Sequence, residues 1–316
     1  MTQASGTDGH EGMMRLKISV EDKYLHRFDG WFEVKDKLSD LGWHIGIDIE
    51  NPDLEMIQTQ MIRALMESKD SRVNRPFIIY ERSGSASIAP MSWRNYLKNK
   101  NVIGYAKETG FRDKSTYNKK HVQGRYHHTL ISDDIPEEPF PMLDDSELEK
   151  IETIFQIYAH SIRYKDLKFS KLKKYKRRTS DVLFSGSVDY DVDIITNHRK
   201  NCCKVLSNIE NANILIGIGR SLSQENWASI LSDTKICVSP YGYGEYSWKD
   251  YEALYAGCIL IKPTSNFVTT HGFDIYKEGA HCIECKPDFS DLEKIVHEVL
   301  NDEEKWANFA FKAHLA

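Results

Sequence analysis

The stretch that decides the fold is residues 239–263, SPYGYGEYSWKDYEALYAGCILIKP. It has the pattern of a buried strand end, a loop with Gly242 and Gly244, a helix, and a second apolar strand that starts near Cys258. Ser247 is a good helix N-cap, and the amides of the first turn behind it point towards the loop. A helix N-terminus reached through a glycine-rich loop is suited to bind a phosphate or diphosphate. The stretch therefore predicts an anion site in an α/β domain.

Strands and helices alternate in both directions from this stretch. Helical spacing of apolar residues predicts helices at 31–41 and 54–66 in the first half, and several more in the second half. Such alternation indicates βαβ units and mostly parallel sheets, whose ligands bind at the carboxyl ends of the strands. The predicted strands are residues 15–20, 44–49, 77–81, 101–106, 181–185, 212–218, 235–239, 258–262 and 281–285.

A change of composition marks the boundary between two domains. Residues 133–149 hold eight acids and three prolines, a helix is expected from 146 to about 164, and residues 163–178 carry nine Lys or Arg. The basic segment is either a solvated linker or a contact with an anionic membrane or acidic acceptor. The expected division is a flexible lead at 1–13, domains at 14–165 and 166–300, and a final helix at 301–316 that packs back on the first domain.

Composition excludes several protein classes. With 41% apolar and 28% charged residues among 316, the chain has enough material for one or two cores. No apolar run reaches the roughly 18 residues that a membrane helix needs, and the N-terminus is not a secretory signal. Six cysteines without a disulfide pattern favour the cytoplasm. The net charge of -5 argues against a general nucleic-acid binder but does not exclude a local basic patch, and we expect no nucleic-acid partner.

The 239–263 stretch resembles the C-terminal nucleotide-sugar region of GT-B glycosyltransferases, with the exostosin type and bacterial family 1-like enzymes as the nearest match. The similarity continues upstream of this stretch, so that it covers about residues 180–300, and it is loose over residues 14–160. It implies two Rossmann-like, doubly wound α/β domains that face a central cleft, with the donor held by the C-terminal one. The matching positions are Pro240, Gly242, Gly244, Ser247, Lys249, Glu252, Ala253, Ala256, Gly257 and Cys258, preceded by the landmarks 183–186, 196–199 and 223–225.

The resemblance also implies roles for particular residues. Glu252 would bind the ribose, while Ser247 and Lys249 would hold the diphosphate. Arg199 and Arg220 are further candidates for its charge, each with a surface ion pair as the alternative. The other donor-binding candidates are Gly186, Gly242, Gly244, Glu245 and three tyrosines that would stack on the base or sugar or pack locally, Tyr241, Tyr243 and Tyr246.

The spacing of two glutamates bears on the stereochemistry. Many retaining GT-B enzymes carry two glutamates with seven residues between them, which places them eight positions apart. Glu245 lies only seven positions before Glu252. This favours an inverting transfer, which needs a general base near the acceptor hydroxyl. Glu81, at the end of an apolar strand, is the first candidate, with an ion pair as its alternative. The others are Asp48, Glu108 and Asp113, while His127 and His128 follow a basic, polar stretch that favours surface histidines.

Other chemistries have weaker support in the sequence. Asp189, Asp191 and Asp193 resemble the metal-binding Asp-x-Asp element of GT-A transferases, which is the main alternative. Cys282 and Cys285 form a lone Cys-x2-Cys pair, and buried thiols are expected there rather than zinc. No Gly-x-Ser-x-Gly elbow or phosphate loop of the kinase type occurs.

The sequence thus predicts a cytoplasmic glycosyltransferase. It would move a sugar from a UDP-, GDP- or dTDP-sugar to a hydroxyl of a glycan or lipid-linked glycan without a required metal, and residues 163–178 would allow peripheral contact with the inner membrane surface. A catalytically inactive nucleotide- or sugar-binding module is the non-enzymatic alternative.

Overall fold

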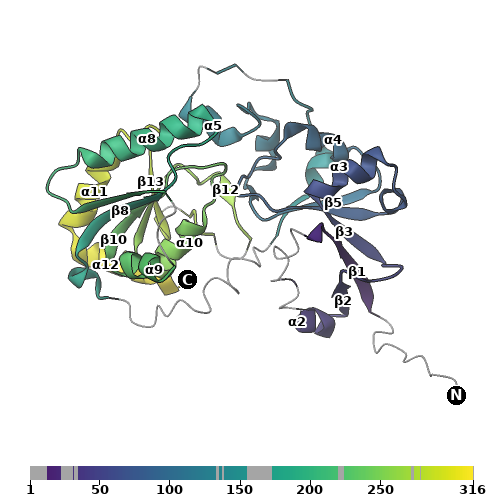
Figure 1. Cartoon of the computed structure of the whole chain (residues 1–316), viewed down its shortest axis with the longest axis horizontal. Coiled ribbons are helices and arrows are strands. Elements are labelled where there is room, and N and C mark those ends of the chain that lie inside the picture. The colour runs from purple at the N-terminus through teal and green to yellow at the C-terminus, as the bar shows by residue number, and fades with distance from the viewer. Residues whose placement is uncertain are drawn as a thin grey trace.

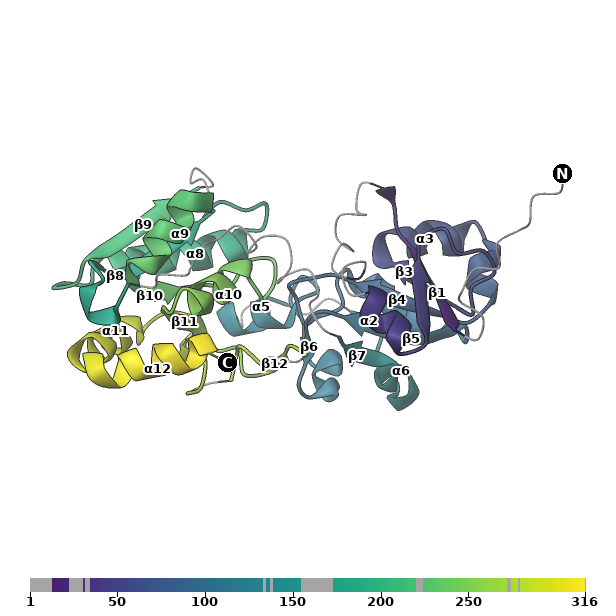
Figure 2. The same cartoon turned by 90° about the horizontal axis from the view of Figure 1, so that it is seen from below.

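The computed structural model describes residues 13–22, 31, 35–132, 135–136, 139–154, 173–219, 224–271, 274–277 and 279–315. These residues form two α/β halves that lie side by side (Figures 1 and 2). The N-terminal sheet has the strand order β2-β1-β3-β4-β5-β7 and the C-terminal sheet the order β13-β11-β10-β8-β9. Neighbouring strands in both sheets pair in parallel. The predicted fold class of two parallel α/β domains is confirmed.

The N-terminal half runs to β7, with 3-10 helices labelled η. Its elements are β1 (Met14–Ser19), α2 (Lys35–Asp40), β2 (Trp43–Gly46), β3 (Leu54–Gln58), α3 (Thr59–Glu67), η2 (Ser71–Asn74), β4 (Phe77–Glu81), η3 (Met91–Trp93), α4 (Arg94–Leu97), β5 (Val102–Lys107), β6 (Gly110–Phe111), η4 (Lys114–Asn118), α5 (Tyr126–Ile131), α6 (Asp145–Glu149) and β7 (Ile151–Thr153).

The C-terminal half follows the same alternation. Its elements are η5 (Tyr175–Arg177), β8 (Ser180–Gly186), α8 (Asp193–Ser207), β9 (Ile214–Ile218), α9 (Gln224–Ser232), β10 (Thr234–Val238), α10 (Trp248–Tyr255), β11 (Ile259–Pro263), β12 (Val268–Thr269), β13 (Cys282–Cys285), α11 (Leu292–Asn301) and α12 (Glu303–Leu315).

Two sequence predictions in the N-terminal half are wrong. Residues 54–58 form β3 rather than the first turn of a helix, and they pair with β1 and β4 inside the sheet. Four of these five side chains are buried, and burial on both faces of a parallel strand hides the period of two. The helix expected from 146 stops at Glu149, because Ile151–Thr153 joins the sheet edge beside β5.

Alternate residues along the C-terminal strands bury two different faces. On β8, Val182 and Phe184 pack with α8 and α11, whereas Leu183 packs with α9 and α10. The helix α12 contacts α10, α11 and β11, all in the C-terminal half (Figure 2). No helix among the described residues is both long and apolar enough to cross a membrane.

The two halves share buried structure. One hydrophobic cluster includes Ile79 and Tyr105 of the N-terminal sheet together with Leu183 and Leu260 of the C-terminal sheet. The short strands β6 and β12 pair across the junction. The helix α5 belongs to the N-terminal half in sequence but packs on α8 (Figure 1). The two halves are therefore joined by shared packing and strand pairing.

Candidate functional site

Two cations meet at the carboxyl end of β8. Gly186 has a φ of 144°, and a Cβ at this position would lie 2.6 Å from Lys249 Nζ and 3.0 Å from Arg199 Nη2. Lys249 comes from the first turn of α10, where Ser247 is the N-cap as predicted. Its ammonium group donates to the Ser185 carbonyl. A side chain at position 186 would therefore displace the cations, which is the reason for glycine here.

The charges of these two side chains have no carboxylate partner in the part of the chain that the structure describes. Arg199 is buried and uses its hydrogen bonds on the carbonyls of Ser187, Pro240 and Tyr241. Burial, helped by the charge of Arg199, lowers the pKa of Lys249 to about 8. Since buried cations are normally paired, this arrangement is suited to bind an anion.

The glycine-rich loop, residues 240–246, approaches the N-terminal half as closely as backbone permits. A Cβ on Gly244 would overlap the backbone of Gly84 and Ser85, and Tyr246 N donates to Gly84 O at 2.8 Å. Gly244 is one of the donor-binding candidates that the sequence predicts in this loop. In the structure it clears space for the other half of the molecule. Gly242 differs, because a Cβ there would meet only Tyr190 Oη at 3.5 Å.

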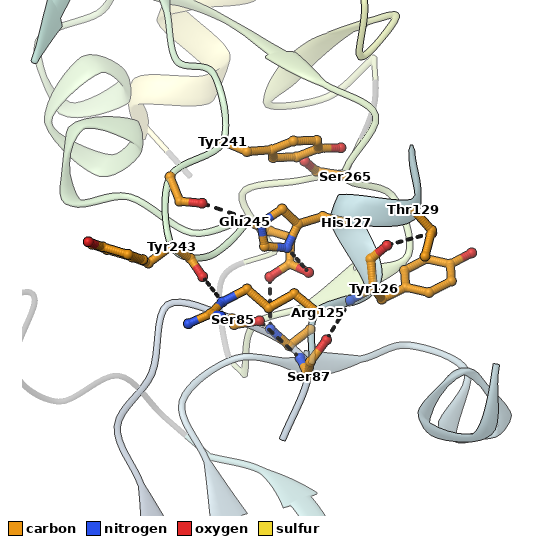
Figure 3. Close-up of polar contacts among 12 residues, drawn as sticks. Ser85, Ser87, Arg125, Tyr126, His127, Thr129, Tyr241, Tyr243, Glu245 and Ser265 are labelled. Atoms are coloured by element: carbon orange, nitrogen blue, oxygen red, sulfur yellow. Dashed lines mark hydrogen bonds and ion pairs between the residues drawn. The ribbon is translucent and has the colours of Figure 1, made fainter. Parts of the chain in front are cut away.

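Side chains of the N-terminal half also hold this loop (Figure 3). Arg125 Nε donates to Tyr243 O at 2.6 Å, and His127 Nε2 lies 3.3 Å from Gly242 O. His127 Nδ1 lies 3.1 Å from Glu245 Oε1, and both side chains are fully buried. The other oxygen of Glu245 accepts the Ala86 amide at 2.9 Å. Burial alone would raise the pKa of Glu245, but the His127 charge and this amide outweigh it and lower the pKa to about 2.

The prediction of surface histidines at 127 and 128 is wrong, since both side chains are fully buried. Burial lowers the pKa of His128 to about 2, which keeps that ring neutral. Sequence reasoning also missed Arg125. Its partner is 118 residues away in sequence and that of His127 is 115 residues away. No local pattern reveals contacts over such separations.

The other predicted donor-binding residues lie around the same loop. Glu252 is buried and accepts from the Trp227 indole at 2.7 Å. Tyr241 is fully buried and stacks on His198 with 5.3 Å between ring centroids, so it packs locally. Tyr243 is exposed and donates to Asp191. Tyr246 packs edge-on against Tyr251.

Of the four candidates for the general base, Glu108 accepts from Tyr80 Oη at 2.6 Å, and the other three have different surroundings. Glu81 is buried, with Oε2 at 2.6 Å from Lys107 Nζ and accepting from Tyr105 at 2.7 Å. It forms the ion pair that was its alternative role, although the cation is not a sequence neighbour. Asp113 is exposed and caps η4 through the Ser115 amide. Asp48 is exposed in the bend after β2. Within the described structure, none of these three contacts the loop or the Lys249–Arg199 pair.

Two of the three carboxylates in the acidic run at 189–193 have side-chain partners in the structure. Asp189 pairs with Lys200 at 2.7 Å, Asp191 accepts from Tyr243, and Asp193 starts α8. Among the described residues, no group of three carboxylate, histidine or cysteine side chains is placed to bind a metal. Cys282 and Cys285 are buried thiols that form no disulfide, as predicted. Arg220 and residues 163–172 of the basic segment lie outside the described residues.

Comparisons with known proteins give matches in structure but not in sequence. No family model matches the chain, and no curated protein matches it in sequence. An α-glucosyltransferase solved with UDP-glucose and DNA has a TM-score of 0.49 at 10% identity, over 96% of this chain and 94% of that one. HepE of Anabaena with UDP-glucose gives 0.48 at 10% identity, over 96% and 94%. A glycosyltransferase of Rickettsia africae gives 0.42 at 11%, over 96% and 90%.

These matches correct one expectation. We expected no nucleic-acid partner, and that exclusion is wrong, because three of the matching structures are complexes of an α-glucosyltransferase with DNA. The exclusion rested on the net charge of the whole chain, and net charge does not rule out a local contact surface.

Proposed function

We propose that this chain is a glycosyltransferase that binds a nucleoside-diphosphate sugar at the carboxyl end of its C-terminal sheet. The observation that carries the proposal is the convergence of Lys249 and Arg199 on Gly186, with no carboxylate partner in the described structure. A diphosphate placed there would gain two charge-assisted contacts and the N-terminus of α10. The same two cations would stabilise the diphosphate as it leaves the sugar, which is the main electrostatic need of the reaction.

We further propose that the transfer needs no metal and inverts the anomeric centre. Two side-chain cations supply the charge that a divalent ion would otherwise bring, and Asp189 and Asp191 are engaged elsewhere. Glu245 is occupied by His127 and Ala86, so it is not placed to act as the first glutamate of a retaining pair.

Calorimetry with nucleotides tests the proposal. We would titrate UDP, GDP, CDP, dTDP and CMP into the protein, each with and without Mg²⁺. One nucleoside diphosphate should bind without the metal. Lys249→Ala should then weaken its binding by roughly 10- to 100-fold, since hydrogen bonds to charged groups contribute about 1.5–3 kcal/mol.

The matched control is Lys294→Ala. Lys294 is an exposed lysine of α11 that pairs with Glu298 at 3.6 Å. This variant should bind like the wild type. Binding that requires Mg²⁺ and is insensitive to Lys249→Ala would contradict the proposal, and so would the absence of any nucleotide binding.

The acceptor we propose is a hydroxyl of a glycan or lipid-linked glycan. Transfer from the identified donor would be assayed on an oligosaccharide, a lipid-linked oligosaccharide and duplex DNA, and product formation on the glycans alone is expected. Transfer to DNA alone would show that the acceptor is DNA and not a glycan. The assignment of the donor would be unaffected.

A further inference from the structure

We infer that Arg125 and His127 of the N-terminal half are positioning residues for the donor loop, residues 240–246 of the C-terminal half. This inference rests on the proposed function, because the loop matters for donor binding only if the adjoining cations hold a diphosphate. Neither residue is assigned contact with the donor. Each acts by fixing the backbone that carries the site (Figure 3).

The carbonyl groups of the loop are held one after another by donors. Arg199 donates to Pro240 O at 3.1 Å and to Tyr241 O at 3.0 Å. His127 Nε2 lies 3.3 Å from Gly242 O, and Arg125 donates to Tyr243 O at 2.6 Å. Four consecutive carbonyls thus have side-chain partners, and two of these partners come from the other half of the molecule.

The chemistry of His127 makes it more than a packing residue. The ring lies between two acceptors, with Nε2 3.3 Å from Gly242 O and Nδ1 3.1 Å from the Glu245 carboxylate. A single ring thereby fixes two loop positions. Because Glu245 also accepts the Ala86 amide, the loop is held against residues 84–87 of the N-terminal half.

The segment that carries these residues has its own support. Tyr126 N donates to Ser87 Oγ at 2.9 Å, next to the turn that Glu245 contacts. Val122 packs with Ile194 and Ile195 of α8. Arg199, which holds the first two loop carbonyls, lies on the same helix and is one of the two cations at Gly186. A continuous chain of contacts therefore runs from residues 122–127 to the anion site.

Two isosteric substitutions separate the two contacts of His127. The amide nitrogen of Gln occupies the place of Nε2, so His127→Gln keeps a donor for Gly242 O. The amide nitrogen of Asn occupies the place of Nδ1, so His127→Asn keeps a donor for Glu245. Each variant removes one of the two contacts, so both should loosen the loop if His127 fixes it at both positions.

Hydrogen exchange tests the positioning directly in the free protein. Amides of residues 241–246 should exchange at least about tenfold faster in Arg125→Leu and in both His127 variants than in the wild type, and near wild-type rates should return in Arg125→Lys. Exchange in β3 and β4 should be unchanged in all four, which shows that the fold is intact. Wild-type loop exchange in Arg125→Leu and in both His127 variants would overturn the inference.

Calorimetry with UDP and with inorganic pyrophosphate then links the loop to the site. His127→Asn, His127→Gln and Arg125→Leu should weaken both ligands by about 5- to 20-fold, and Arg125→Lys should restore the binding. If the wild type binds these ligands, and Lys249→Ala weakens the binding while His127→Asn leaves it unchanged, the inference is overturned and the proposed function stands. No binding to the wild type would refute the proposed function, while the exchange result would still decide whether these residues position the loop.

Discussion

Gly244 has no Cβ, and this allows its backbone to lie against the backbone of the N-terminal half. A Cβ there would overlap the Gly84 carbonyl and the Ser85 amide, and neither backbone can move aside as a flexible side chain would. Gly244→Ala should therefore lower the free energy of unfolding by about 2 kcal/mol or more, in the range of an overpacked core. Urea denaturation of the ligand-free protein measures this loss.

The control for this prediction lies two residues away. Gly242→Ala would place its methyl group 3.5 Å from Tyr190 Oη, an ordinary contact. Its free energy of unfolding should stay within roughly 0.5 kcal/mol of the wild type, as for a benign surface substitution. Equal losses in the two variants would show that the loop as a whole, and not the approach of Gly244 to Gly84, limits stability.

The start of α10 depends on one buried carboxylate. Asp250 Oδ2 accepts from Ser247 N at 3.0 Å and from Tyr276 Oη at 2.7 Å, and it lies 3.0 Å from Lys262 Nζ. Asp250→Asn keeps the shape but leaves the Lys262 charge buried and unpaired. The expected cost is about 3–5 kcal/mol in the free energy of unfolding, measured by urea denaturation.

A double substitution distinguishes lost pairing from lost capping. Asp250→Asn combined with Lys262→Met removes both charges, so it should destabilise by clearly less than the sum of the single changes. Glu298→Gln, which breaks the exposed pair with Lys294, should cost less than about 1 kcal/mol. Additive losses in the double variant would contradict a role for the charge pair.

At the scale of elements, local patterns predicted most of the fold. The strand at 77–81, the N-cap at Ser247 and the helix it starts are visible in sequence because caps and periodicity act within a few residues. The strand at 54–58 was mistaken for a helix because burial on both faces removes the alternation. β7 was missed because a three-residue edge strand carries too little pattern.

At the scale of the molecule, the site was only half predictable. Lys249 lies on the same short stretch as Gly242 and Gly244, so the sequence alone places it at the proposed anion site. Glu81 was expected in the cleft, but its partner Lys107 lies on the neighbouring strand, and only the pairing of the strands brings them together. Contacts between the halves, such as that of His127 with Glu245, depend on the docked geometry and have no local signal.

Docking of the two halves should be sensitive to acid through Glu245. Its pKa is lowered from the usual 4.5 to about 2, because the His127 charge and the Ala86 amide outweigh the effect of burial. A depressed folded-state pKa stabilises the protein above the unfolded-state value, and this stability is lost as the pH falls from about 4.5 towards 2. Each tenfold change in proton affinity corresponds to about 1.4 kcal/mol, so the contribution at neutral pH is about 3 kcal/mol.

Urea denaturation between pH 3 and pH 7 measures this dependence. Glu245→Gln should be less stable than the wild type at pH 7, since it leaves His127 without a carboxylate, and the difference should shrink steadily below about pH 4.5. Other acids titrate in the same range, but they are present in both proteins and cancel in the difference. Glu298→Gln provides the control, because its exposed carboxylate should give a small and nearly constant difference. A stability gap for Glu245→Gln that stays constant down to pH 3 would mean that the carboxylate charge does not hold the halves together.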